Sequence, residues 1–247
     1  MNPQTKMTRQ VVQKSQKQAL QSDSAETAQA TAMRDKPLEG RRYRGISNEA
    51  RKAERQQRFL EAGMACFARD GFHGSTVRGV CASAGLTERY FYESFQSMEA
   101  LFQAVYLHVS GQVRGNVLAV VASVAPDDLN RFSRSALRAF FESIHRHPAF
   151  VPILFQEALS VSAQMTRLAL STLNEFIELL ITIGQPSFVQ QTSVHIDPGL
   201  ISSGLVGGIM HMAVRWSDDG FHTPLDDVVD NAMLIFAGVL SRDVAAQ

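Results

Sequence analysis

Residues 74–101 constrain the fold of this chain most, because they read as two short helices joined by a tight turn. Thr76 can cap a first helix over residues 77–83, in which apolar side chains recur at helical spacing. Gly85 is expected to end that helix, since glycine adopts a left-handed conformation without a Cβ clash. Leu86 is then placed to pack back onto the pair, so the sequence predicts a sharp helical corner.

A second helix is predicted from Glu88 to about Phe95, with Thr87 as its N-cap. Only Phe91 and Phe95 must face inward, at an i, i+4 spacing. The other side chains can hydrogen-bond and are free to face outward: Glu88, Arg89, Tyr90, Tyr92, Glu93 and Ser94. Such a helix suits the DNA major groove, where arginine can donate to bases and tyrosine to phosphates. The same turn also occurs in helical bundles that bind no ligand, and that alternative stays open at this point.

A spaced pattern covers most of this segment: Gly85, Leu86, Thr87, Phe91, Tyr92, Phe95, Ser97, Glu99 and Leu101. With these residues, the stretch from 47 to 101 resembles the DNA-binding domain of the TetR family of bacterial transcriptional regulators. The resemblance implies an all-α, homodimeric, DNA-binding regulator. The residues expected at the DNA are Thr76, Arg78, Thr87, Glu88, Arg89, Tyr90 and Tyr92.

Two positions depart from the pattern of the family. Met98 stands where relatives usually carry a lysine that reaches a backbone phosphate. Glu93 stands where many relatives have an aromatic or basic residue. The resemblance therefore implies DNA binding with one phosphate contact fewer than in typical relatives.

The charge of the chain is unevenly distributed although its net value is zero. Residues 1–110 hold 16 Lys and Arg against 11 Asp and Glu, whereas residues 111–247 hold 8 against 13. This asymmetry is typical of a protein in which only the front half meets phosphates.

The N-terminal segment, residues 1–45, is rich in polar residues and is predicted to be disordered. It ends in a basic cluster of Arg41, Arg42 and Arg44, which could enter a minor groove or follow the DNA backbone. A solvated basic linker is an equally good interpretation.

The DNA-binding domain is predicted over residues 46–96. Its first helix should run from the N-cap Ser47 to about Asp70, with an apolar stripe that closes a three-helix unit. That stripe consists of Phe59, Leu60, Gly63, Met64 and Phe67. Its polar face, which includes Arg55 and Arg58, can meet either phosphate or solvent.

Residues 97–247 are predicted to form a helical ligand-binding and dimerisation domain. Helices are expected from Ser97 to about 123, from 126–127 to before Pro148, over about 153–161, 163–183, 198–216 and 224–240, with a loop over 184–196. No strand pattern competes with these helices.

The last two predicted helices are apolar on more than one side, which favours pairing with a second copy in a four-helix interface. Gly204, Gly207 and Gly208 would allow close backbone approach, and the TetR family dimerises in this region. The residues expected at the interface are Leu205, Gly208, Ile209, Met212, Val229, Met233, Phe236 and Leu240.

A small apolar effector is expected to bind among the middle helices and to shift the long helix that leads to the DNA-binding unit. The candidate pocket residues are Phe140, Phe141, His145, Phe155, Glu157, Met165, Phe176 and Met212. Each of these also fits an ordinary core position, because Phe and Met at helical spacing fill cores.

The resemblance implies a ligand-responsive repressor, and the residues offer little support for an enzyme. Glu142 and His145 have the Glu-x-x-His spacing of di-iron bundles, but such sites need a second copy of the motif, so we expect no metal, cofactor or catalytic residue. The remaining alternative is a helical binding module or enzyme that keeps the fold without operator recognition. Cys66 and Cys81 suit buried, reduced thiols. No apolar run of about 18 residues appears, so we expect a cytoplasmic protein.

Overall fold

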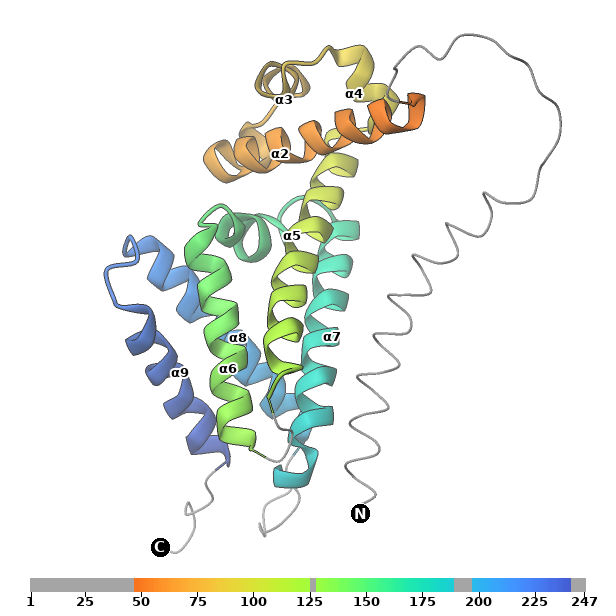
Figure 1. Ribbon diagram of the computed structural model, residues 1–247. Coiled ribbons are helices and arrows are strands. Elements are labelled where there is room, and N and C mark those ends of the chain that lie inside the picture. The colour runs from red at the N-terminus through yellow and green to blue at the C-terminus, as the bar shows by residue number, and fades with distance from the viewer. Residues whose placement is uncertain (1–46, 125–127, 189–196, 241–247) are drawn as a thin grey trace, which may run out of the picture. The chain divides into compact units, whose positions relative to one another are not determined.

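The computed structural model describes residues 47–124, 128–188 and 197–240 (Figure 1). Within these ranges every regular element is a helix, which confirms the all-α prediction. The elements are α2 (Asn48–Gly74), α3 (Val77–Ala84), α4 (Glu88–Ser94), α5 (Met98–Val121), α6 (Leu129–Arg146), the π-helical turn η1 (Pro152–Glu157), α7 (Ala163–Phe188), α8 (Pro198–Asp218) and α9 (Leu225–Leu240). The predicted disordered segment 1–45, with its basic cluster, lies outside the described residues.

Helix α2 forms the base on which α3 and α4 pack. Phe59 and Phe67 are fully buried on its inner face, as the apolar stripe predicts. The helical path breaks at Gly71, whose φ of 71° and ψ of 172° are accessible essentially to glycine alone. Phe72 then packs against Phe67 and against Phe102 of α5, with ring centroids 6.0 and 5.5 Å apart. The end of α2 is therefore fixed to the start of the following helices.

The turn between α3 and α4 has the predicted chemistry. The Thr76 hydroxyl accepts a hydrogen bond from the Gly79 N–H at 3.1 Å and so caps α3. Gly85 is left-handed, with φ 62° and ψ 36°, and its N–H donates to the Ala82 carbonyl. The Leu86 N–H donates to the Cys81 carbonyl, which completes a Schellman motif.

Helix α5 connects the α2–α4 unit to the remaining helices (Figure 1). Ser97 caps it by accepting a hydrogen bond from the Ala100 N–H at 3.1 Å, as predicted. Leu101 and Phe102 are fully buried, at the end of α5 that contacts α2. Further along, α5 packs against α6. One continuous helix thus contacts both parts of the described chain.

Helices α6 to α9 pack as α6 against α9 and α7 against α8. Arg134 and Arg138 of α6 form ion pairs with Asp230 and Asp226 of α9, which fix the register of these two helices. Asp197 caps α8 through the N–H groups of Gly199 and Leu200, as predicted from the Asp-Pro pair.

Three predicted boundaries are wrong. Helix α6 begins after Asp128, which accepts a hydrogen bond from the Arg131 N–H, rather than at 126–127. The helix expected over 153–161 is instead the π-helical turn η1, in which residues five apart come into line; Ile153 and Ala158 are both fully buried. Helix α7 continues to Phe188 beyond the stop expected near 183, because helix ends are poorly determined by local sequence.

Cys66 and Cys81 are buried and unpaired, which confirms the predicted reduced thiols. Burial raises the pKa of the Cys81 thiol, and the nearby charge of Glu88 raises it further. No helix of the described ranges is long and apolar enough to cross a membrane.

Candidate DNA-binding surface and ligand cavity

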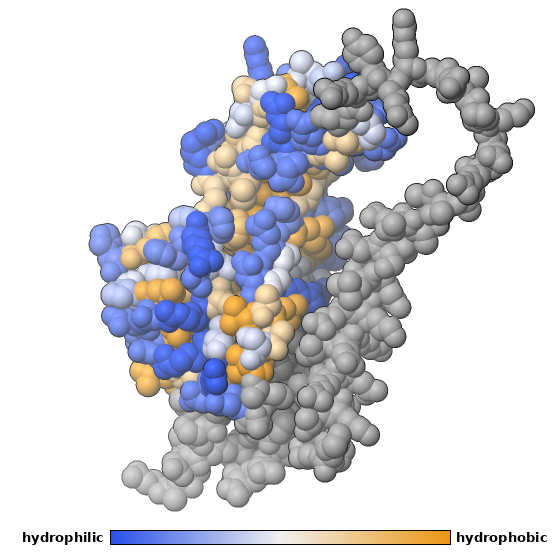
Figure 2. Space-filling model, in the orientation of Figure 1, coloured by the Kyte–Doolittle hydropathy of each residue, from blue (hydrophilic) through white to orange (hydrophobic). Residues whose placement is uncertain are grey.

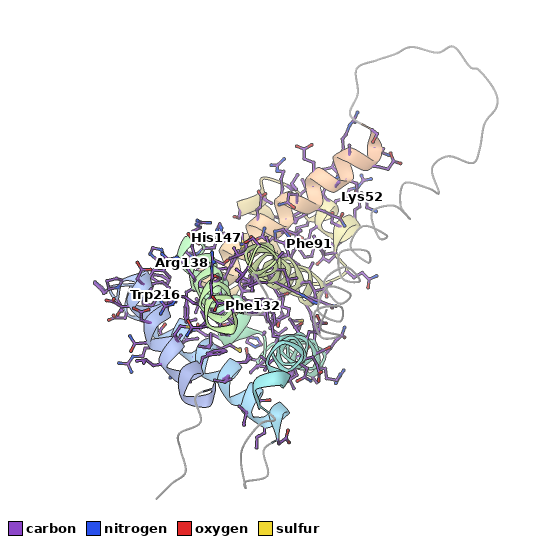
Figure 3. The ribbon with its side chains drawn as sticks, turned by 60° about the horizontal axis from the view of Figure 1, so that its bottom comes forward. Lys52, Phe91, Phe132, Arg138, His147 and Trp216 are labelled. Atoms are coloured by element: carbon purple, nitrogen blue, oxygen red, sulfur yellow. The ribbon has the colours of Figure 1, made fainter. Side chains whose placement is uncertain are left out.

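Helix α4 is anchored through one buried side chain and exposes most of the others. Phe91 is fully buried and meets Phe59 of α2 edge-on, with ring centroids 5.5 Å apart (Figure 3 labels Phe91). Tyr92 is 59% exposed, Tyr90 is 38% exposed, and Arg89 also faces solvent. In Figure 2 the visible surface of α2–α4 is largely hydrophilic. The outward face predicted from the sequence is therefore present.

Two of the outward side chains of α4 have partners within the chain. Arg89 Nε donates to Glu93 Oε1 at 3.0 Å, one helical turn away. This pair is exposed and contributes only about 0.3–0.5 kcal/mol, so Arg89 can leave it for another acceptor. The guanidinium of Arg55 lies over the ring of Tyr90, 4.7 Å from its centroid. Tyr90 is thus held by α2, whereas the ring of Tyr92 lies edge-on to that of its neighbour Phe91, 5.3 Å between centroids, and is 59% exposed.

Arg58 of α2 fixes the turn that precedes α4. Its Nη2 donates to the Ala84 carbonyl at 2.6 Å, at the C-terminal end of α3, where a positive charge is favourable. A Cβ added at Gly85 would lie 3.0 Å from the same nitrogen. Arg58 therefore has a structural role at this turn in addition to its exposure on the polar face of α2.

The other predicted DNA-contacting residues are exposed. Thr76, Arg78 and Glu88 are exposed at the beginnings of α3 and α4. Thr87 occupies the N-cap position of α4 but forms no side-chain capping bond, so its hydroxyl group is not used as predicted. Met98, where the family usually has lysine, is half-buried against the core. The predicted residues Arg41, Arg42 and Arg44 lie outside the described residues.

A cavity of about 240 Å³ lies among α5, α6, η1, α7 and α8, and Phe236 of α9 also lines it. Its wall consists mainly of aliphatic and phenylalanine side chains, with five hydroxyl groups: Tyr106, Ser110, Ser133, Thr172 and Ser202. None of its lining residues is Asp, Glu, Lys, Arg or His. Burial raises the pKa of Tyr106, so its hydroxyl is neutral at physiological pH. The cavity therefore suits an apolar molecule.

Three of the eight predicted pocket residues line this cavity: Phe140, Phe155 and Phe176. The other five lie elsewhere. Phe141 and Met165 are fully buried in the core, and Met212 packs against the core without reaching the cavity. His145 is exposed, with its ring stacked 5.3 Å from that of Trp216, which is labelled in Figure 3. Glu157 points toward α2.

The prediction missed most of the wall because it searched for large residues. Helix α5 contributes one continuous face at spacings of three and four residues: Tyr106, Ser110, Val113, Val117 and Val121. Phe132 of α6, labelled in Figure 3, also lines the cavity. Small side chains on the inner face of a long helix were the available signal, since they leave space that Leu or Phe would fill.

Glu157 links η1 to the break in α2. Its Oε2 accepts a hydrogen bond from the Phe72 N–H at 2.8 Å, and its carboxylate lies against Gly71, where an added Cβ would be 3.0 Å from Oε1. His73 Nε2 lies 3.4 Å from the Ser160 carbonyl, directly after η1. Leu154 and Phe155 of the same turn line the cavity. One short element therefore contacts both the cavity and the α2–α4 unit.

Most of the predicted interface residues are buried inside one protomer. Leu205, Ile209, Val229, Met233 and Phe236 retain less than 10% exposure in one protomer, so they offer little surface to a second copy. The position of the interface stays a prediction. Met212 and Gly208 are half-buried, and the side chain of Leu240 lies outside the described ones.

The exposed apolar residues of α8 and α9 lie on other faces. Leu200 is 73% and Leu234 is 71% exposed, and Ile235 is also exposed. A Cβ added at Gly204, Gly207 or Gly208 would meet nothing within 4 Å. These two helices therefore present exposed apolar surface on faces other than the predicted one.

The Glu-x-x-His pair considered as a metal motif has other contacts. Glu142 Oε1 accepts from Arg146 Nη2 at 2.6 Å, and His145 stacks on Trp216 as described above. The described part of the chain contains no cluster of three or more His, Cys, Asp or Glu that could hold a metal ion.

A helix-turn-helix consists of two helices that are joined by a tight turn and packed on a third helix, as α3 and α4 are on α2. Residues 59–105 match the family model described as "Bacterial regulatory proteins, tetR family". This match confirms the resemblance found in the sequence over the helix-turn-helix region.

Individual proteins of known sequence or structure are similar to this chain. YerO of Bacillus subtilis (strain 168), an uncharacterized HTH-type transcriptional regulator, is 23% identical over 104 residues, covering 42% of this chain and 36% of YerO. A TetR-like transcriptional regulator from Rhodococcus sp. RHA1 has a TM-score of 0.65 at 21% identity, covering 80% of this chain and 100% of the other. The FadR regulator of Bacillus subtilis, solved in complex with stearoyl-CoA, has a TM-score of 0.65 at 14% identity. The match covers 75% of this chain and 99% of FadR. The family and these relatives are regulators, not enzymes.

Proposed function

We propose that the protein is a transcriptional repressor that binds a palindromic operator as a homodimer and releases it when a small apolar molecule enters the cavity. The observation that carries this proposal is the exposed face of α4, which Phe91 anchors on α2 and which follows the turn that Arg58 fixes at Ala84. In a helix-turn-helix protein this face lies in the major groove. Such a protein acts on the bacterial chromosome, so the proposal requires a cytoplasmic location.

The roles at the DNA follow from exposure and chemistry. Arg89 is the candidate for base readout, since among the described residues its ion-pair partner is the exposed Glu93, one helical turn away. Tyr90 is expected beside it, and Tyr92 is the candidate for a phosphate contact that positions the helix. Thr76, Arg78, Thr87 and Glu88 complete the surface, and the basic cluster at Arg41, Arg42 and Arg44 is proposed to add contacts outside the groove.

The proposed dimer uses the exposed faces of α8 and α9. Leu200, Gly204 and Gly207 lie on the outward face of α8, opposite the residues that line the cavity, while Leu234 and Ile235 project from α9. Glycines on that face permit close crossing of two helices. A symmetric pairing would place two copies of α4 on successive major-groove segments.

The effector is proposed to be an apolar molecule, because the cavity wall is apolar and carries no charged side chain. The FadR relative, with its stearoyl-CoA, supports an aliphatic ligand as the first class to test.

The route from the cavity to the DNA-binding unit is proposed to pass through η1. A ligand that displaces Leu154 or Phe155 moves the turn that carries Glu157, and so changes its bond to the Phe72 N–H. That bond lies at the Gly71 break, where α2 has no continuous helix to resist the change. The two conformations would differ in the spacing of the two α4 helices.

The proposal is tested by mixing the purified protein with sheared DNA from its source genome, recovering bound fragments and sequencing them. We expect enrichment of one or a few palindromic sites, with half-sites about 10 base pairs apart or a multiple of this. Uniform recovery of all fragments would contradict operator recognition and favour the alternative, a helical binding module without DNA specificity.

The dimer face is tested with Leu234→Arg, which places a charge on a surface that is 71% exposed in one protomer. The matched control is Leu107→Arg, on α5, where the leucine is 46% exposed. Analytical ultracentrifugation should show a weakened dimer for the first variant alone. An unchanged dimer in Leu234→Arg would place the interface on another surface.

A further inference from the structure

Ser202 is an unusual residue in the cavity wall. It is 0% exposed, and its Oγ has no hydrogen-bond partner. Buried hydroxyl groups are nearly always paired, because an unpaired one costs folding free energy. Among the described side chains, only one other buried polar atom lacks a hydrogen-bond partner, and it is Nε of Arg55 in the α2–α4 unit. The cavity wall therefore contains an unsatisfied polar atom.

Other hydroxyl groups near Ser202 in sequence or in the cavity do have partners. Ser203, the next residue of α8, donates to the Gly199 carbonyl at 2.7 Å. Ser110 donates to the Leu107 carbonyl at 3.2 Å. The α8 backbone could satisfy a serine in the same way, yet Ser202 does not form that bond. A group that enters the cavity can supply the missing partner.

Ser202 lies on the face of α8 that lines the cavity. Leu205, Val206 and Ile209 follow it at spacings of three, four and seven residues, and all of them line the same cavity. The hydroxyl group thus lies at the end of an apolar row. A ligand with an aliphatic part along this row would bring its polar end to Ser202.

The charge of that polar end is restricted by the surroundings. No lining residue is charged at neutral pH, since the only acid among them is Tyr106, whose pKa is raised by burial. A carboxylate or ammonium group at this depth would be buried without a counter-ion, which is strongly unfavourable. An uncharged oxygen needs only one hydrogen bond, which a serine hydroxyl can supply.

We propose that the cavity selects an aliphatic ligand with one uncharged oxygen group, an alcohol, ketone or ester, and that Ser202 is its hydrogen-bond partner. This inference rests on the proposed ligand response and names the chemistry of the ligand.

The test uses the full chain and three probes: 1-octanol, octanoate and ethylbenzene, which has no oxygen. Binding is measured by isothermal titration calorimetry for the wild type, Ser202→Ala and the control Ser203→Ala. We expect 1-octanol to bind at least about 10-fold more tightly than octanoate to the wild type, as one buried unpaired charge requires. Ser202→Ala should weaken 1-octanol by about 2- to 10-fold, the range of one net hydrogen bond. Ethylbenzene should bind the wild type and Ser202→Ala with equal affinity. Ser203→Ala should bind all three probes like the wild type.

Thermal unfolding separates a ligand role from a structural one. Because the hydroxyl of Ser202 has no partner, its removal should leave the melting temperature unchanged or raised. A lowered melting temperature in Ser202→Ala, or unchanged 1-octanol affinity, overturns the assignment. Octanoate that binds as tightly as 1-octanol and is weakened by Ser202→Ala overturns the exclusion of charge.

The same protein preparation separates this inference from the proposed function. If none of the probes binds, the ligand inference fails, whereas enrichment of palindromic DNA would still support the regulator. If the probes bind as expected but no DNA is enriched, the ligand site stands and operator recognition fails.

Discussion

The bond between Glu157 and the Phe72 N–H gives a quantitative test of how η1 holds the DNA-binding unit. Glu157→Ala removes the accepting carboxylate and leaves the half-buried N–H of Phe72 without this hydrogen bond. Hydrogen bonds to charged groups contribute about 1.5–3 kcal/mol, and we take about 1.5 because the carboxylate is half-buried. For a domain of this size, the melting temperature should fall by about 3–6 °C. Glu157→Gln keeps an acceptor oxygen, so its melting temperature should fall by about half as much.

The matched control for Glu157→Ala is Glu142→Ala. Glu142 pairs with Arg146 on the exposed side of α6, an interaction of about 0.3–0.5 kcal/mol, so its loss should lower the melting temperature by only about 1–2 °C. Calorimetry or circular dichroism supplies the measurement. In Glu157→Ala, the effect of 1-octanol on operator affinity should also shrink. Equal melting temperatures for the two variants would refute the role of the bond, and an unchanged 1-octanol response would refute the route through η1.

Four other predictions concern the DNA, the dimer and the thiol. Arg89→Ala should weaken operator binding by about 1–3 kcal/mol and relax base preference, whereas Tyr92→Phe should weaken binding to all sequences alike. Competition binding on operator and random DNA distinguishes the two roles. Equal losses of affinity on both DNAs for both variants would reject the assignment. Removal of residues 1–44 should reduce the salt dependence of binding by a log-log slope of about 0.9 per lost phosphate contact, and an unchanged slope would mean a linker. Gly208→Leu should weaken the dimer in sedimentation, because a side chain there meets nothing within 4 Å in its own protomer; a dimer of normal strength would move the interface. Cys81 should react more slowly with iodoacetamide at pH 7 than a free thiol, because its raised pKa keeps it protonated, and a rate equal to that of free cysteine would contradict this.

Local chemistry made the helix ends predictable from the sequence. Thr76, Gly85, Ser97 and Asp197 act as predicted, because caps depend on the few residues around them. The fold class and family followed from the same segment, since the Gly85 turn and the spacing of Phe91 are local patterns.

The candidate pocket and interface were less predictable because they depend on which apolar face turns inward. Val229 and Leu234 are both apolar residues of α9, yet one is 0% and the other 71% exposed. Periodicity identifies two apolar faces but does not say which of them meets the protomer's own core. Similarly, Phe155 and Met165 are both large apolar residues at helical spacing, but only Phe155 borders the space left by the small residues of α5.

The short length of α4 has a consequence for the thermodynamics of DNA association. Seven residues are too few to form a stable helix alone, since isolated helices shorter than about 12–15 residues are marginal in water. Phe91 and the edge-on contact with Phe59 provide that stability before any DNA arrives. Association then orders no new secondary structure in α4, and its heat capacity change reflects the buried interface without a contribution from folding of the recognition helix.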